Sequence, residues 1–264
     1  MLPRDGIGAG APLRAALLAL AVVSPACRSL SGDTAAATPQ RPTLSADTST
    51  TANSSLELEL GGLLLDGGSA STPLTVKYGA SDTTELFVGL TPYQRVDVPG
   101  TDEDGLGDLS LGVRERVADE TDDRPSLAVQ AIVKIPTADE DRGLGTGELD
   151  LVLAGIATRS LPPWTFTGFG QLDLLGDPAG GVLVGQSLAA AVSRPLEEDF
   201  AVFGEIAGVL VPETDSEQLF ATLGVTHAPS PARVLDLGVV VGLTEEAPDF
   251  GLVLGLTQNL GSIR

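Results

Sequence analysis

The sequence predicts an all-β protein, an antiparallel up-and-down transmembrane β-barrel of about twelve strands, preceded by a signal peptide and a flexible linker. Apolar and polar residues alternate at every second position, which is the period of a strand with two unlike faces. Most alternating runs exceed the usual five or six residues of soluble strands and suit the roughly 9 to 11 residues that a membrane-spanning strand needs. Hydrophobic residues make up 42% of a chain whose net charge is −21, so its apolar surface requires an apolar environment.

Residues 1–26 are predicted to be an export signal. Two arginines precede the apolar run 15–23, which is too short to span a bilayer as a helix. The small residues Ser24 and Ala26 suit cleavage by ordinary signal peptidase. Cys27 follows directly and resembles the lipidated cysteine of a bacterial lipoprotein, although Ser24 stands where such signals usually carry an aliphatic residue. Ordinary cleavage and lipidation of Cys27 therefore remain two alternatives.

Residues 27–54 are predicted to form a disordered linker. From Arg28 to Ser54, 18 of 27 residues are Ser, Thr, Ala or Pro. Such a segment buries too little apolar area to offset the entropy lost on ordering. The folded domain is expected to cover residues 55–264.

Twelve alternating runs follow this linker in order. They cover residues 55–65, 73–79, 84–93, 108–117, 125–135, 147–158, 163–175, 181–194, 199–211, 217–227, 232–243 and 249–260. The connections after the sixth, eighth and tenth runs are tight and carry prolines, whereas 96–107 and 136–146 are long and acidic. Short turns at one end and longer loops at the other are typical of outer-membrane barrels, in which both termini are periplasmic.

The two faces of these runs differ in charge. One face, with Leu149, Leu151 and Leu153 as an example, has no charged residue and is predicted to meet lipid. The other face carries charges of both signs, which can pair across neighbouring strands, as Glu85 could with Arg114. Such pairs could simply hold a solvated lumen open, or some of them could line a solute path. The predicted lumen-lining residues are Glu85, Arg114, Arg116, Lys134, Glu148, Asp150, Asp173, Glu205 and Asp236.

The composition argues against several functions. An excess of acidic residues opposes nucleic-acid binding, and one Cys with one His argues against disulfides, zinc sites and multi-histidine centres. His227 is the only histidine base available, and Gly185–Ala189 does not follow the pattern of a nucleophile elbow. No cofactor, metal site or enzymatic activity is therefore expected.

Three stretches resemble a known family. They are GLGDLSLGVRERV (105–117), SLAVQAIVKIPTAD (126–139) and GLGTGELDLVLAG (143–155), and the end GLTQNLGSIR is similar to the last strand of the same proteins. The recurring features are a Gly-Asp strand opener, a strand that ends in Lys-x-Pro-Thr, and a glycine-rich return. The family is that of bacterial outer-membrane barrels named for the meta-pathway of phenol degradation. The resemblance implies an outer-membrane barrel and a transporter, and it supplies no substrate.

These observations predict a narrow channel or transporter for small solutes in the cell outer membrane, with outer-membrane lipid around it. An excess of lumenal carboxylates would favour cations, whereas separate basic and acidic walls would suit a zwitterionic or polar solute. The alternative is a soluble or lipid-tethered all-β surface module that binds a ligand or partner.

Overall fold

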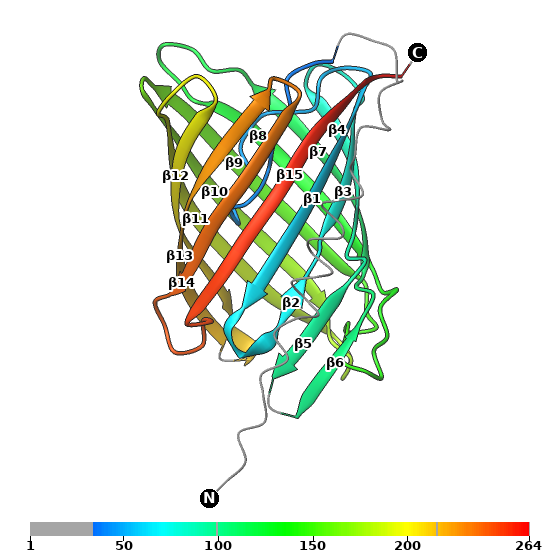
Figure 1. Ribbon diagram of the computed structural model, residues 1–264. Coiled ribbons are helices and arrows are strands. Elements are labelled where there is room, and N and C mark those ends of the chain that lie inside the picture. The colour runs from blue at the N-terminus through cyan, green and yellow to red at the C-terminus, as the bar shows by residue number, and fades with distance from the viewer. Residues whose placement is uncertain (1–33, 99, 215, 264) are drawn as a thin grey trace, which may run out of the picture.

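The computed structural model of the chain describes residues 34–98, 100–214 and 216–263. Twelve antiparallel strands close into a barrel, because β15 pairs with β1 (Figure 1). The twelve-stranded up-and-down barrel expected from the sequence is therefore confirmed. The strands are β1 (Ser55–Leu65), β3 (Leu74–Gly79), β4 (Thr84–Leu90), β7 (Leu109–Ala118), β8 (Ser126–Ile135), β9 (Asp150–Leu161), β10 (Trp164–Gly176), β11 (Val182–Pro195), β12 (Phe200–Val211), β13 (Ser216–Ser230), β14 (Arg233–Gly242) and β15 (Phe250–Ser262).

The barrel has an apolar outside and a polar inside. Leu188 and Leu223 on the outer face are 71% and 63% exposed, whereas Glu57, Lys77 and Glu85 inside are fully or almost fully buried. This is the reverse of a soluble fold, and it follows from the period of two because neighbouring residues point to opposite sides of the wall. No helix in the described residues is long and apolar enough to cross a bilayer.

The two ends of the barrel differ. At one end, here called the turn end, β9 and β10 are joined by Pro162 and Pro163 alone, and β1 begins where β15 ends. At the opposite, loop end lie the long connections, including the short strand β2 (Ala70–Ser71) and the two 3-10 turns η2 (Asp66–Gly68) and η3 (Pro212–Thr214).

One loop is more ordered than the sequence suggested. The acidic connection 96–107 contains most of a hairpin of β5 (Gln94–Val98) and β6 (Thr101–Gly105), which extends beyond the barrel at the loop end (Figure 1). Arg95 lies 2.9 Å from a carboxylate oxygen of Asp102 and 3.4 Å from one of Asp97. These ion pairs offset part of the repulsion among the acidic side chains.

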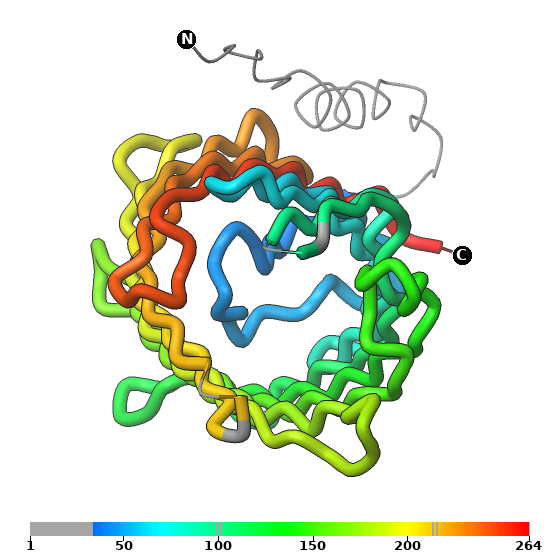
Figure 2. The backbone as a smooth tube through the Cα atoms, turned by 90° about the horizontal axis from the view of Figure 1, so that it is seen from below, coloured from blue at the N-terminus to red at the C-terminus, as the bar shows by residue number. Residues whose placement is uncertain are grey.

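The main correction concerns the predicted linker. Residues 34–54, here called the plug, lie inside the barrel, where Figure 2 shows them crossing the lumen. Thr51 is fully buried and Ser45 is 4% exposed. The expectation of disorder was wrong for this segment, because hydrogen bonds to the wall order it and Ala46 packs in an apolar cluster of the wall. Cys27 and the predicted signal peptide lie outside the described residues.

Candidate functional site

The site is the lumen of the barrel together with the plug. The plug enters and leaves at the turn end, since the Ala37 amide donates to the Pro231 carbonyl (2.8 Å) and the Ser54 amide donates to the Gly79 carbonyl (2.7 Å). Between these two anchors the plug reaches Glu205, in the middle of β12. It therefore folds back on itself inside the wall (Figure 2).

Glu205 holds the tip of the plug. Its carboxylate accepts hydrogen bonds from the backbone amides of Leu44 and Ser45, both at 2.8 Å, and from the Ser45 hydroxyl. Glu205 is 3% exposed. Because a buried carboxylate needs donors or a counter-charge, the plug satisfies the charge of Glu205 without a basic residue.

Glu85 holds the returning arm of the plug. One of its oxygens accepts hydrogen bonds from the Thr51 amide (2.8 Å) and hydroxyl (2.7 Å). The other lies 3.3 Å from Nη1 of Arg114, which also donates to the Ser49 carbonyl. Arg114 donates through Nε and Nη2 to Gln130 as well. The cross-strand pair of Glu85 and Arg114 is thus present, and both partners also contact the plug.

Lys77 is the centre of a third anchor, on β3. Its ammonium lies 2.6 Å from Glu57 and 3.2 Å from Glu59, and it donates to the Thr38 carbonyl at 2.7 Å. Glu57 accepts from the Thr38 amide and hydroxyl, and Glu59 accepts from the Gln40 amide. The alternation along these strands places all three charges inward, but only the structure shows that they hold the entering arm of the plug.

Lys134 forms a fourth cluster, nearer the loop end. Its ammonium lies 2.8 Å from Asp150 and 3.1 Å from Asp108. Burial alone would raise the pKa of Asp108. Hydrogen bonds from the amides of Ala138 and Thr137, together with the nearby Lys134 ammonium, outweigh this effect, so the pKa lies below its ordinary value. Asp108 therefore remains ionised and anchors the loop after β8.

The other predicted residues take different positions. Arg116 lies at the turn end, where it donates to the Asp82 carbonyl (2.8 Å) and pairs with Asp119 (2.9 Å). Glu148 is exposed in the loop that precedes β9, because that strand begins only at Asp150. Asp173 faces inward and accepts a hydrogen bond from Gln171 at 2.8 Å.

The sequence left open whether the lumen has an excess of carboxylates or separate basic and acidic walls, and the positions of the charged side chains bear on this question. The three basic side chains Lys77, Arg114 and Lys134 each lie within 4 Å of a carboxylate, so they form no free basic wall. Asp173, Glu205 and Asp236 have no basic partner within that distance among the described residues. The unpaired charge of the wall is therefore negative.

Glycines shape the inner wall. Phe203 on β12 lies over Gly224 on the neighbouring β13 and reaches Gly238 on β14, and Phe87 on β4 lies over Gly112 on the neighbouring β7. A Cβ atom at any of these glycines would overlap the aromatic ring or come within van der Waals distance of it. The missing side chains let large inward residues lie flat against the wall.

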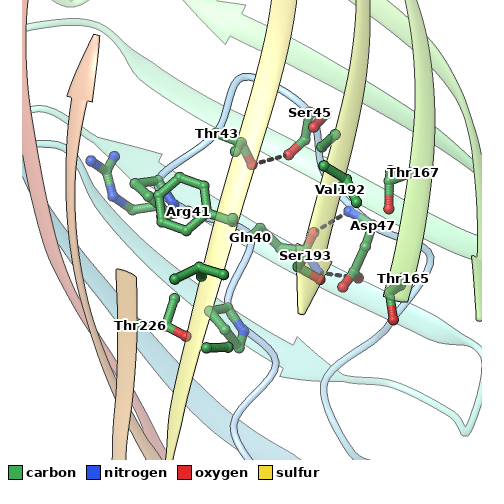
Figure 3. Close-up of a pocket in the computed structure, with 16 residues that line it drawn as sticks. Gln40, Arg41, Thr43, Ser45, Asp47, Thr165, Thr167, Val192, Ser193 and Thr226 are labelled. Carbon is green, nitrogen blue, oxygen red and sulfur yellow. Dashed lines mark hydrogen bonds between the residues drawn. The ribbon is translucent and has the colours of Figure 1, made fainter. Parts of the chain in front are cut away.

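Two cavities flank the plug. One of about 190 Å³ lies between the plug and β10 to β13, with Gln40, Asp47, Thr165 and Ser193 in its lining (Figure 3). Another of about 250 Å³ is lined by the plug and by Lys77, Glu85, Arg114 and Gln130. Both are lined by polar and apolar side chains, and both share Gln40 and Arg41 of the plug.

His227 lies near the turn end, with its ring stacked on Phe200 and its Nδ1 3.4 Å from Asp199. Across the described ranges, no group of three His, Cys, Asp or Glu residues could hold a metal ion.

Solved structures with the same fold are outer-membrane channels and porins. The COG4313 outer membrane channel from Pseudomonas putida F1 has a TM-score of 0.62 at 13% identity, covering 83% of this chain and 100% of that one. The NanC porin has a TM-score of 0.55 at 9% identity, and the KdgM porin has a TM-score of 0.54 at 7% identity. Each of these two matches covers 76% of this chain and 98% of the porin. No curated protein matches the sequence.

This fold places the chain in the cell outer membrane, in agreement with the apolar outer face. The resemblance noted in the three stretches of sequence also extends well beyond them, because the pattern of one family matches residues 31–260, which include the plug and nearly the whole barrel. The chain belongs to the family described as "Putative MetA-pathway of phenol degradation".

Proposed function

We propose that the protein is a narrow, gated channel for small solutes, with the plug as its gate. The observation that carries this proposal is that hydrogen bonds to polar groups of the wall make up most of the specific plug contacts, while Ala46 alone joins the buried apolar cluster of the described residues. Water can replace hydrogen bonds of this kind, so the polar groups that the plug frees on withdrawal can be solvated by water in the lumen. The apolar outer face disfavours the alternative of a soluble surface module.

The wall favours cations among the possible solutes. Among the described residues, Asp173, Glu205 and Asp236 lack basic partners, whereas the inward basic side chains Lys77, Arg114 and Lys134 are each paired with a carboxylate. In a narrow lumen with low-dielectric walls, such a surplus gives a negative potential that attracts cations. The KdgM porin is known with disordered oligogalacturonate, an acidic sugar chain, and the surplus here favours the opposite sign of charge.

Planar-bilayer recording tests the channel and its gate together. We expect the full barrel to conduct rarely and a barrel lacking residues 34–54 to conduct steadily. In a salt gradient its reversal potential should indicate cation preference, and D173N with E205Q should weaken that preference. A gel-shift assay for the folded barrel provides the control. A folded, inserted and plug-free barrel without conductance would refute the channel, and anion preference would refute the argument from charge.

The amino-terminal predictions are part of the same proposal. An exported barrel needs a signal, and lipidation of Cys27 would add an acyl anchor before the plug. We expect C27A to abolish incorporation of labelled fatty acid while leaving the gel shift of the folded barrel unchanged. No incorporation into the unmutated protein would leave ordinary signal-peptidase cleavage as the explanation.

A further inference from the structure

A small notch in the wall receives the one basic side chain of the plug. Gly61 on β1 and Gly255 on β15 are direct cross-strand partners at the seam that closes the barrel. A Cβ atom at Gly61 would overlap the guanidinium of Arg41, and one at Gly255 would overlap the carboxylate of Asp236. The two glycines therefore open a space that a guanidinium and a carboxylate enter from different sides.

One of the two acidic groups near this notch, Asp236, is not satisfied, whereas Glu59 is paired with Lys77. Asp236 is 6% exposed, and neither of its carboxylate oxygens has a hydrogen-bond partner among the described residues. Within the same residues, Nε of Arg41 also lacks a hydrogen-bond partner. The nitrogens of Arg41 lie more than 4.0 Å from the carboxylate oxygens of Asp236, so the two side chains do not form an ion pair. Glu59, the next inward residue before Gly61, is 4% exposed and completes the acidic surroundings.

Arg41 occupies this place differently from the rest of the plug. The anchors at Glu57, Glu85 and Glu205 bind mainly backbone amides and hydroxyls, which water or many other polar groups could replace. The notch instead receives the guanidinium of a charged side chain, whose Cζ, Nε and Nη2 atoms occupy the place of a Cβ atom at Gly61. In Figure 3 the Arg41 side chain points away from Thr165 and Thr167.

We propose that the Gly61–Gly255 notch, with Asp236 and Glu59, is a cation subsite of the channel for a guanidinium or primary ammonium group, and that Arg41 is its built-in occupant. This inference rests on the proposed channel function and names the chemistry of its solutes. A planar guanidinium or a compact ammonium fits a space that two glycines define, and each can donate to the unpartnered oxygens of Asp236. A quaternary ammonium has no N–H donor, so it should bind far less well.

Chemical rescue of an Arg41 variant tests the proposal. R41A leaves the notch empty, so we expect higher conductance than in the unmutated protein. Methylguanidinium at millimolar concentration should then block R41A, and the double variants R41A/D236N and R41A/G61A should require at least tenfold more for the same block. Tetramethylammonium at equal concentration controls for general effects of cations. T43A, which changes the plug two residues away, should not gain sensitivity to methylguanidinium.

A second measurement keeps the test independent of conductance. Methylguanidinium should raise the melting temperature of detergent-folded R41A but not that of R41A/D236N, because only the former retains the unpaired carboxylate. Equal block or equal stabilisation in the two variants, or an equal effect of tetramethylammonium, would overturn the subsite. Conductance by R41A without selective block would overturn the subsite and leave the channel intact. Silence of both R41A and the plug-free barrel would overturn the channel, while the thermal measurement would still decide whether the notch binds the cation.

Discussion

Replacement of Glu205 by Gln should loosen the plug more than any other single change of similar size. Glu205 accepts two amide hydrogen bonds at 2.8 Å and a hydroxyl hydrogen bond, all from the tip of the plug. A hydrogen bond to a charged group contributes about 1.5 to 3 kcal/mol. Gln has nearly the same shape, but it is neutral and turns an NH₂ group towards amides that also donate.

The size of the effect follows from the two amide bonds. Gln keeps one carbonyl oxygen, so one amide bond is lost and the other becomes a weaker neutral one. Together these losses amount to about 3 kcal/mol, which is about a hundredfold in the equilibrium between inserted and withdrawn plug. Lumenal water can satisfy the freed amides, and this compensation reduces the expected shift to about tenfold or more. E205Q should therefore raise the open probability of the channel by about that factor.

Two assays follow the plug directly. Single-channel recording gives the open probability, and a T43C variant in a C27A background reports how fast a water-soluble thiol reagent reaches the plug. D173N is the matched control, because Asp173 is also an inward, buried carboxylate, but it accepts its hydrogen bond from Gln171 of its own strand and not from the plug. Equal open probability and equal labelling in E205Q and D173N would refute the reasoning, since the loss of wall charge would then explain any change.

Three further predictions concern the barrel. L188R places a charge on the most exposed outer leucine and should cost about 2 to 4 kcal/mol at the bilayer midplane, so the folded gel shift should be lost, whereas Q171R on the inner face should retain it. Because the pKa of Asp108 is lowered in the folded state, its contribution to stability is complete above the unfolded pKa and is lost as the pH falls through the lower folded pKa. Protease sensitivity of the loop after β8 should therefore rise only in strong acid. The D108N variant should show the same sensitivity at neutral pH. G112V should destabilise the barrel by about 1 to 3 kcal/mol because its side chain would meet the Phe87 ring, and F87A should relieve much of that loss in the double variant, as urea unfolding would show.

The barrel could be predicted from the sequence because its rule is local. Asp150 points inward and Leu151 outward for no reason other than the strand period, and the same holds along every strand. The strand boundaries were less accurate where pairing with a neighbour extends a strand, as in β13, which continues to Ser230 beside β14.

The plug could not be predicted in this way. Ser45 and Glu205 lie 160 residues apart, and no local pattern links them. The linker composition indicated disorder because that argument weighs apolar burial, whereas the plug is ordered by amides and hydroxyls that bind carboxylates. Arg41 was the available signal, as the one basic residue among the described residues before β1, but its meaning depends on two glycines that become neighbours only when the barrel closes.

The direct covalent connection of the plug to β1 has a kinetic and thermodynamic consequence. Thr51 is bound inside the barrel, and Ser55, only a few residues later, is already paired with Ser262. A tether this short holds the plug at a high effective concentration near its own binding groups, on the millimolar scale typical of short flexible linkers. A free solute with the same intrinsic affinity must approach that concentration before it displaces the plug. The resting barrel would then respond to abundance of its solute rather than to traces of it.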